Sequence, residues 1–386
     1  MLPRLRSKVL LAGSLLGLAG SLLFDFLLLR PNRLAEGEGL SLFQALQWHY
    51  WLPLLLFWAY FLFRSFTGSE RLGNAELLPA VLAPAALLFL LGEASTGLLS
   101  QAPPMARASV GSGFWISCLA LFLLLLALYS KVQPGWPKPW LFGAGAAIGL
   151  WILLSGRLND LSVIVELLQR QGRFWAELSN HAWITGVSVS ISTCAGIPLG
   201  LAVVRQAWLR EKAFFVLNIV QTIPGLALFG LLIAPLTLLV ETVPLLGELG
   251  IQGIGWTPAV IALTLYAMLP IVRNTYAGFS GVEPELREAG RGMGMNRVQL
   301  LFLVELPRAL PVLLGGLRIA IVQNVGNTAL AALIGAGGLG VFIFQGLGQA
   351  ALDLILLGAL PTIALAAGID AVFQALIRFT TPRGLR

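Results

Sequence analysis

The stretch Glu288–Pro307, EAGRGMGMNRVQLLFLVELP, is a polar, glycine-containing segment that lies between two strongly apolar regions of the chain. A few residues earlier, Pro284 favours the start of a helix, because a proline at the first helical position gives up no hydrogen bond. Gly292 and Gly294 favour the end of that helix, since glycine readily adopts a left-handed exit conformation. The pattern predicts a first short helix at the surface of an otherwise apolar protein.

A second helix is expected directly after the first. Asn296 is followed three residues later by Gln299, which is the spacing of a reciprocal capping box. Leu306 precedes Pro307, and a residue before proline is disfavoured in helical conformation, so we expect this helix to end there. Two short helices tied to apolar spans on both sides form a surface element that can transmit motion to the membrane.

The composition excludes an ordinary soluble domain. Of the 386 residues, 57% are hydrophobic and 11% are charged, and the mean hydropathy is +0.85, whereas a soluble domain has about 25% charged residues. The two cysteines, Cys118 and Cys194, lie in apolar runs and are interpreted as packing residues. With only two histidines, the chain has almost nothing with which to build a zinc site.

Apolar windows long enough to cross a bilayer predict an all-α integral membrane protein with about ten transmembrane helices. Alternating apolar and polar residues are lacking, which excludes a barrel. The first window resembles a secretory signal, but its length favours an uncleaved span. The predicted spans are 9–29, 46–63, 76–92, 112–130, 139–155, 183–204, 213–236, 257–279, 309–334 and 352–377.

The charge distribution predicts the orientation. Ten spans place both termini on one side, and placing them in the cytoplasm puts most of the 25 Lys and Arg residues in cytoplasmic segments. The loop at 237–256, which this orientation places outside, is consistent with it, because the loop has two glutamates and no basic residue. We therefore expect a multi-pass membrane protein with N- and C-termini in the cytoplasm.

Composition also predicts a division of the chain. Residues 1–155 form a Leu-rich N-terminal bundle of about five helices, and 156–180 read as an external amphipathic segment. Residues 181–380 are richer in Gly, Ser, Thr and Pro, which allow close helix packing in lipid, and contain the polar loop at 280–307. The second half is therefore the expected working core and the first half an accessory bundle.

The opening stretch resembles the EAA loop of ATP-binding-cassette (ABC) importer permeases. Its spacing matches Glu-Ala-Ala, three residues, Gly, nine residues and Ile-x-Leu-Pro, with only Gly290 and Val304 departing from the pattern. The resemblance implies that these residues couple the permease to an ATPase: Glu288, Ala289, Gly290, Gly294, Val304, Leu306 and Pro307.

Further stretches resemble the glycine betaine, choline and carnitine subfamily of these permeases. They are QTIPGLALFGLL (221–232), LPIVRNTYAGF (269–279) and ALIGAGGLGVFIFQGL (332–347). This resemblance covers about 180–377 and implies a core with the five-helix fold of type I ABC importers. The additional N-terminal spans and the overall length resemble YehY-like osmoprotectant permeases.

The resemblance also implies partners. A second permease subunit, identical or homologous, pairs with this one in the membrane, a cytoplasmic ABC ATPase dimer binds the EAA loops, and a periplasmic or lipid-anchored protein delivers the solute. The chain contains no G-x-x-x-x-G-K-[ST] loop. ATP and Mg are therefore expected in the partner ATPase, and neither a cofactor, a catalytic residue nor a metal site is expected in this chain.

Polar side chains within the ninth span are candidates for the translocation path. Four of them recur at helical spacing, and polar groups in lipid need either partners or a water-lined path. Interhelical hydrogen bonding, at the interface between permeases, is the alternative interpretation. The four residues are Gln323, Asn324, Asn327 and Thr328.

Other features have mainly structural interpretations. Arg318 and Asp370 are expected to find partners or to reach the inner surface. Trp48–Trp51 is expected in an interfacial aromatic belt rather than a cage for a quaternary amine. A glycine-rich turn on the outer side, with an expected influence on gating, comprises Gly335, Gly337, Gly338 and Gly340.

Rival functions are less consistent with these patterns. An ion-coupled carrier needs intramembrane acidic residues and matched halves, and a membrane enzyme needs a cluster of reactive side chains. A non-transporting assembly factor would explain neither the polar residues of span nine nor the EAA loop. Within the importer class, an amino acid or another small solute remains an alternative to a quaternary amine.

Overall fold

The computed structural model describes residues 8–32, 35–67, 74–129 and 138–381. The chain divides into two compact units. Unit 1 comprises Met1–Gln169 with Gln349–Asp353, and unit 2 comprises Arg170–Gly348 with Leu354–Arg386. The division falls inside the segment 156–180, for which the sequence predicts an external amphipathic region.

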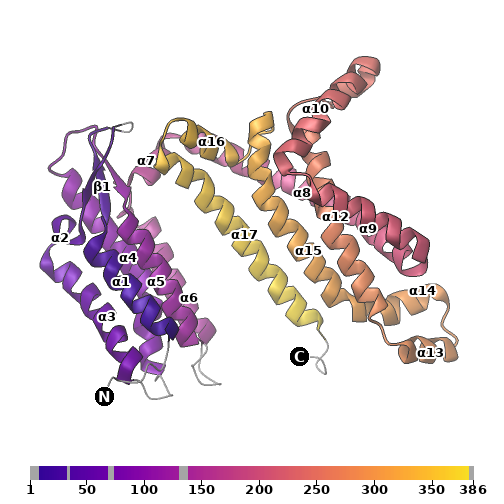
Figure 1. Ribbon diagram of the computed structural model, residues 1–386, viewed down its shortest axis with the longest axis horizontal. Coiled ribbons are helices and arrows are strands. Elements are labelled where there is room, and N and C mark those ends of the chain that lie inside the picture. Colours follow the sequence, from indigo (N-terminus) through magenta and orange to yellow (C-terminus); the bar gives the residue numbers. More distant parts are fainter. Residues whose placement is uncertain (1–7, 33–34, 68–73, 130–137, 382–386) are drawn as a thin grey trace. The chain divides into compact units, whose positions relative to one another are not determined.

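Unit 1 is a helical bundle with a small sheet (Figure 1). Its helix α1 packs against α5 and α3, and α4 packs against α5 and α6. The elements in chain order are α1 Lys8–Leu23, β1 Leu27–Arg30, β2 Glu38–Leu40, α2 Leu42–Ala45, α3 Trp48–Thr67, α4 Asn74–Leu99, β3 Arg107–Val110, α5 Ser112–Tyr129, α6 Lys138–Leu154 and α7 Ser162–Gln169.

The sheet corrects the first predicted span. We expected a helix over 9–29, but α1 ends at Leu23 and the chain continues as β1, the central strand of the antiparallel order β2-β1-β3. Leu27 is opposite Leu40 on one side and Val110 on the other, and its side chain is fully buried. A run of leucines has no period that distinguishes a buried strand from a helix, so the sequence alone missed this strand.

Close packing in unit 1 depends on a glycine. Gly17 of α1 faces the ring of Trp58, which is fully buried, and a Cβ atom at Gly17 would lie 2.3 Å from two of the ring carbons. Glycine therefore permits α1 and α3 to approach each other across the aromatic ring.

Unit 2 is built around α8, α12 and α15, since α12 packs along both of the other two helices. Its elements in chain order are α8 Gln171–Arg205, α9 Ala207–Thr222, α10 Gly225–Thr242, α11 Pro244–Glu248, α12 Trp256–Ser280, α13 Pro284–Gly292, α14 Arg297–Gln299, the π-helix η1 Leu300–Glu305, α15 Leu306–Thr328, the 3₁₀-helix η2 Ala329–Ile334, α16 Gly340–Gly348 and α17 Leu352–Thr380.

The predicted span 213–236 is also wrong. The structure breaks it at Ile223 and Pro224, so that α9 and α10 are separate helices. Ile223 has φ −72° and ψ 126°, the extended conformation that a following proline favours. Pro224 then caps the start of α10, and the apolar composition on both sides of the break concealed it.

The membrane class predicted from composition is confirmed. Among the described residues, seven helices are long and apolar enough to cross a membrane, and two shorter apolar helices lie at Lys8–Leu23 and Trp140–Leu154. The seven spans are Glu76–Leu99, Ser112–Tyr129, Gln171–Arg205, Gly225–Thr242, Trp256–Ser280, Arg297–Ile334 and Leu352–Thr380.

Candidate functional site: the EAA loop and the polar contacts of the core helices

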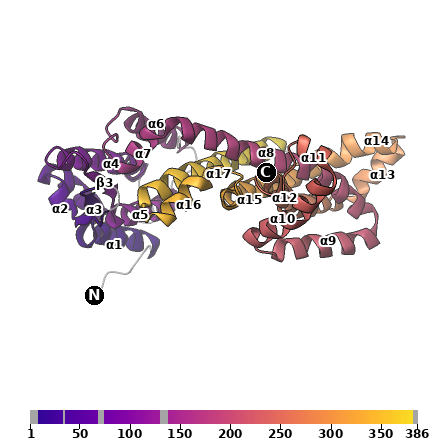
Figure 2. The ribbon, with the colours of Figure 1, turned by 90° about the horizontal axis from the view of Figure 1, so that it is seen from above.

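The EAA loop (residues 280–307) contains the two short helices that its sequence predicts. Helix α13 begins at Pro284 and ends at Gly292, and Gly294 has φ +82°, a left-handed conformation that suits glycine. Figure 1 shows α13 and α14 beyond one end of α12 and α15, and Figure 2, turned by 90°, shows them there again. The loop is therefore a structured element that extends from the bundle of unit 2.

Asn296 starts the second helix as expected. Its Oδ1 accepts hydrogen bonds from the backbone N–H groups of Val298 and Gln299, at 3.0 and 2.9 Å. The Gln299 side chain in turn accepts from the Asn296 N–H at 2.9 Å, which completes the capping box.

The expected end of this helix at Pro307 is wrong. A wide π turn, η1, follows α14 and continues directly into α15, with Pro307 in its first turn. Pro307 has no backbone N–H to donate, and it directly follows the π turn, where the regular α-helical hydrogen-bond pattern is already interrupted. The consequence is a continuous helical path from Asn296 into the membrane-spanning part of α15.

Two ion pairs fasten the loop to itself and to α15, and a hydrogen bond fastens it to α12. Arg287 donates to Glu305 of η1 at 2.8 Å and also to the Phe279 carbonyl oxygen at 2.5 Å. Arg308 donates to Glu283 at 2.6 Å. A hydrogen bond from its own backbone N–H, and then the one from Arg308, hold the pKa of Glu283 below its usual value.

The two departures from the family pattern lie together. Gly290 is buried, and a Cβ atom there would be 2.7 Å from Cδ1 of Leu300 and 3.6 Å from Cγ2 of Val304. The glycine therefore allows α13 to pack closely on η1, where the smaller Val304 stands in place of isoleucine.

Several side chains of the EAA loop are exposed, and four of these are large and apolar. Glu288 and Ala289 are exposed, as are four large apolar side chains, with exposed fractions of 57 to 71%. Exposed apolar side chains are available for contact with lipid or with another protein. The four are Met293, Val298, Phe302 and Leu303.

The four path candidates of span nine do not share one environment. Asn324 and Thr328 are fully buried between core helices. Asn324 Nδ2 donates to Ser188 Oγ and to the Leu263 carbonyl oxygen, both at 3.1 Å, and the hydroxyls of Thr328 and Thr185 lie 2.9 Å apart. These two side chains form interhelical hydrogen bonds within this chain, and whether they lie on a path or at an interface between permeases stays a prediction.

The other two candidates remain partly exposed. Gln323 approaches Gln221 of α9, with 3.5 Å between their side-chain amides, and Asn327 is half-buried. That they line a path stays a prediction.

The glycine-rich turn at 335–340 is attached to the beginning of α8. Gly335, Gly337 and Gly338 have φ between +79° and +86°, and a Cβ atom at Gly340 would lie 1.8 Å from the Ala329 carbonyl oxygen. Glycine is therefore required by conformation at three of these positions and by space at the fourth.

Three side chains that sequence reasoning missed hold this turn. The carboxylate of Glu177 accepts from the Gly338 N–H at 2.7 Å, and Asn180 donates to the Ala336 carbonyl oxygen at 2.7 Å. His181 bridges two segments, with Nε2 3.0 Å from the Val325 carbonyl oxygen and Nδ1 accepting from the Leu339 N–H at 3.3 Å. The signal was the spacing of the polar residues in ELSNH (177–181), which places them on one helical face.

Arg318 and Asp370 form an ion pair between α15 and α17, and Gln374 donates to the same carboxylate at 2.7 Å. The expectation that these two charged side chains find partners is confirmed. A buried or half-buried pair of this kind satisfies charge within the helical bundle and needs no role in transport.

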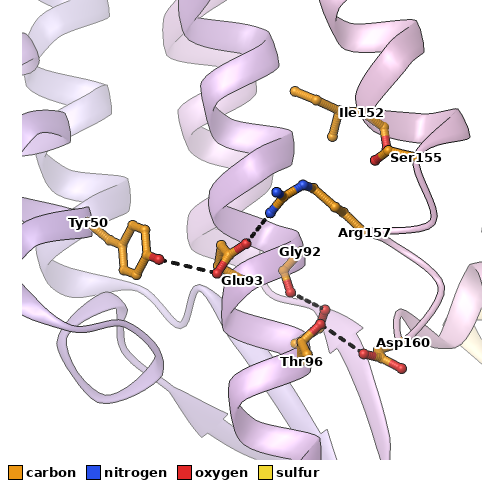
Figure 3. A network of polar contacts seen from close by, with 9 residues as sticks. Tyr50, Gly92, Glu93, Thr96, Ile152, Ser155, Arg157 and Asp160 are labelled. Carbon is orange, nitrogen blue, oxygen red and sulfur yellow. Dashed lines mark hydrogen bonds and ion pairs between the residues drawn. The ribbon is translucent and has the colours of Figure 1, made fainter.

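Unit 1 has a polar network of its own (Figure 3). Arg157 donates to Glu93 at 2.5 Å, Tyr50 donates to the other oxygen of Glu93 at 3.3 Å, and Thr96 donates to Asp160 at 2.8 Å. These contacts join α3, α4 and the segment before α7. The Tyr50 hydroxyl therefore has a structural role, because it is bonded to Glu93.

The fold and the EAA loop together define the class as a multi-pass permease subunit of a membrane transport system. Residues 192–384 match the family model described as binding-protein-dependent transport system inner membrane component, and the chain belongs to this family. Residues 5–164 match the N-terminal domain of the ABC transporter permease YehY.

Relatives agree with this assignment. The chain is 40% identical to the osmoprotectant import permease protein OsmW of Salmonella typhimurium over 58% of its own length and all of the relative. It is 37% identical to the glycine betaine/carnitine/choline permease protein OpuCB of Bacillus subtilis, over 57% of this chain and 91% of the relative. Its fold is also similar to a solved MetNI methionine ABC transporter chain, with 24% identity, a TM-score of 0.48 and coverage of 55% and 98%.

Proposed function

We propose that this permease subunit carries a small quaternary-amine osmoprotectant, such as glycine betaine, across the bacterial inner membrane. The observation that carries the proposal is the match over the full length of the Salmonella osmoprotectant permease. Permeases named for choline and for glycine betaine, carnitine and choline support the same class of solute.

The EAA loop is the proposed contact with a cytoplasmic ATPase dimer. Its exposed apolar side chains give a docking surface, and Glu288 and Ala289 lie on the exposed part of α13. ATP and Mg are held by that ATPase in this proposal, and a separate solute-binding protein and a second permease subunit complete the importer.

The internal contacts of the loop explain how force reaches the membrane. Arg287 joins α13 to η1 and to the end of α12, and η1 continues into α15. A push on α13 therefore moves α12 and α15 together, because the loop is fastened at both ends. The two termini lie in the cytoplasm in this arrangement, on the same side as the ATPase.

The path is assigned to the half-exposed residues of α15. Gln323 and Asn327 are half-exposed, whereas Asn324 and Thr328 are fully buried and hydrogen-bond to neighbouring helices. We therefore narrow the predicted path to Gln323 and Asn327.

The test is uptake in a bacterial strain that lacks its own osmoprotectant importers. The chain is expressed together with the ATPase and the binding protein of its importer. The uptake of labelled glycine betaine, choline and methionine is then compared. Uptake of glycine betaine or choline that requires an intact ATPase is the expected result. Uptake of methionine alone would assign an amino-acid importer, and uptake independent of the ATPase would contradict the ABC class.

A further inference from the structure

A cavity of about 640 Å³ lies between the end of α8, the end of α12 and the EAA loop. Its walls contain four arginines and one carboxylate, which come from α8, α13, α14 and η1. We call it the arginine cavity, and its charged lining residues are Arg205, Arg287, Arg291, Arg297 and Glu305.

The charges in the arginine cavity are not balanced. Glu305 is engaged by Arg287 at 2.8 Å. The side chains of Arg205, Arg291 and Arg297 make neither a hydrogen bond nor an ion pair with any residue in the described ranges. Three guanidinium groups around one space repel one another, and an anion placed between them would relieve that repulsion.

The rest of the lining is apolar. Leu201, Val204 and Phe279 come from the ends of the core helices, and Met295 and Leu300 come from the loop. The cavity therefore combines an apolar wall beside the spanning helices with a cationic rim beside the loop. Guanidinium groups match phosphate oxygens in geometry as well as charge, because they donate two parallel hydrogen bonds.

We propose that the arginine cavity binds a phosphate-bearing anion. Basic pockets at the cytoplasmic ends of membrane helices suit the headgroups of anionic lipids, and a free phosphate has the same binding chemistry. Because Arg291 and Arg297 belong to the EAA loop while Arg205 belongs to α8, a bound anion ties the loop to a spanning helix. A bound anionic lipid or a bound phosphate would thus restrict the motion of the EAA loop relative to α8.

The experiment uses the purified full chain in detergent, without ATPase, and counts bound anions by native mass spectrometry. The probes are short-chain phosphatidylglycerol, short-chain phosphatidylcholine and inorganic phosphate. Wild-type protein is expected to retain one phosphatidylglycerol or one phosphate, and phosphatidylcholine is expected to bind more weakly. Phosphatidylglycerol binding without phosphate binding identifies a lipid headgroup, and binding of both identifies the phosphate group itself as sufficient.

The double variant Arg291→Gln/Arg297→Gln is expected to weaken retention at least about tenfold, since hydrogen bonds from charged donors are lost. Arg273→Gln removes one positive charge from α12 outside the cavity, the same change as Arg205→Gln, and is expected to bind like wild type. Arg205→Gln tests the opposite wall if the double variant is poorly folded, and Arg291→Lys/Arg297→Lys is expected to restore part of the binding.

Equal retention by wild type and all glutamine variants, or no retention by wild type, would overturn the proposal. Because the measurement involves neither solute nor ATPase, its failure leaves the proposed transport function untouched.

Discussion

The Glu93 network of unit 1 and the EAA loop differ in how fully their side chains find partners within the chain. In unit 1, Glu93 is satisfied by Tyr50 and Arg157 from the same unit. In the EAA loop, apolar side chains are exposed, and Arg291 and Arg297 have no hydrogen-bond or ion-pair partner among the described residues. The difference points to the EAA loop as a region that can bind other molecules, because side chains without a partner in one subunit are available to another molecule.

The largest effect is expected for Glu288→Lys. The substitution reverses an exposed charge on the proposed docking surface, so uptake should fall on the order of tenfold or more while the protein remains folded in the membrane. The measurement is solute uptake together with the ATPase activity of the assembled importer. Glu285→Lys, an equal charge change on the same helix outside the family pattern, is the control, and an equal loss of uptake there would remove the special role of Glu288.

Gly17→Ala tests the close packing of α1 against α3 in unit 1. A Cβ atom would lie 2.3 Å from the Trp58 ring, and an overpacked core costs about 1–3 kcal/mol. A lower midpoint of thermal unfolding in detergent is expected. Gly143→Ala in α6, where nothing lies within 4 Å of the new atom, should change the midpoint little. Equal midpoints for the two variants would show that α1 and α3 are not in close contact.

A smaller effect is expected for Gly290→Ala, which restores the family pattern. The new methyl group meets the flexible end of Leu300 at 2.7 Å, while alanine favours the helix by up to about 1 kcal/mol. These opposing effects should leave thermal stability and uptake close to wild type. A loss of uptake comparable to that of Glu288→Lys would mean that the close contact of α13 with η1 is essential to coupling.

The smallest effect is a pH dependence at Glu283. Its pKa is lower in the folded protein, so its contribution to stability is complete above the pKa of the unfolded chain. That contribution is lost as the pH falls through the folded pKa. Glu283→Gln should therefore reduce the dependence of the unfolding midpoint on pH in the acid range, with Glu285→Gln as the control. If the unfolding midpoint of Glu283→Gln depended on acid pH in the same way as that of wild type, the ion pair between Glu283 and Arg308 would not be a source of the pH dependence.

The sequence predicted the EAA loop better than it predicted the spans around it. Pro284, Gly294 and the pair Asn296–Gln299 impose local conformations that need no tertiary contact, and all of them have the expected geometry. By contrast, the break at Ile223–Pro224 and the strand at Leu27–Arg30 lie in uniformly apolar runs. In those runs the conformation depends on contacts with neighbouring segments, and the amino-acid composition does not indicate it.

The polar residues of α15 show the same limit. Helical spacing placed Asn324 and Thr328 with Gln323 and Asn327, but it does not reveal which neighbouring helix covers each face. The contacts with Ser188 and Thr185 bury the first two. Likewise, the links of Glu177, Asn180 and His181 to the glycine-rich turn join residues that are 156 to 161 positions apart in sequence, and no local pattern predicts such a pairing.

Helix α8 has contacts at both of its ends. Near its first turns, Glu177, Asn180 and His181 hold the glycine-rich turn, and at its last turn Arg205 borders the EAA loop. At 1.5 Å per residue, about 40 Å separates these two attachments. Helix α8 is thus a single strut with one end on the glycine-rich turn and the other beside the coupling machinery, so a tilt imposed at one end displaces the other without a relay of side chains. Pro198, near the loop end of this helix, is the place where such a strut would bend.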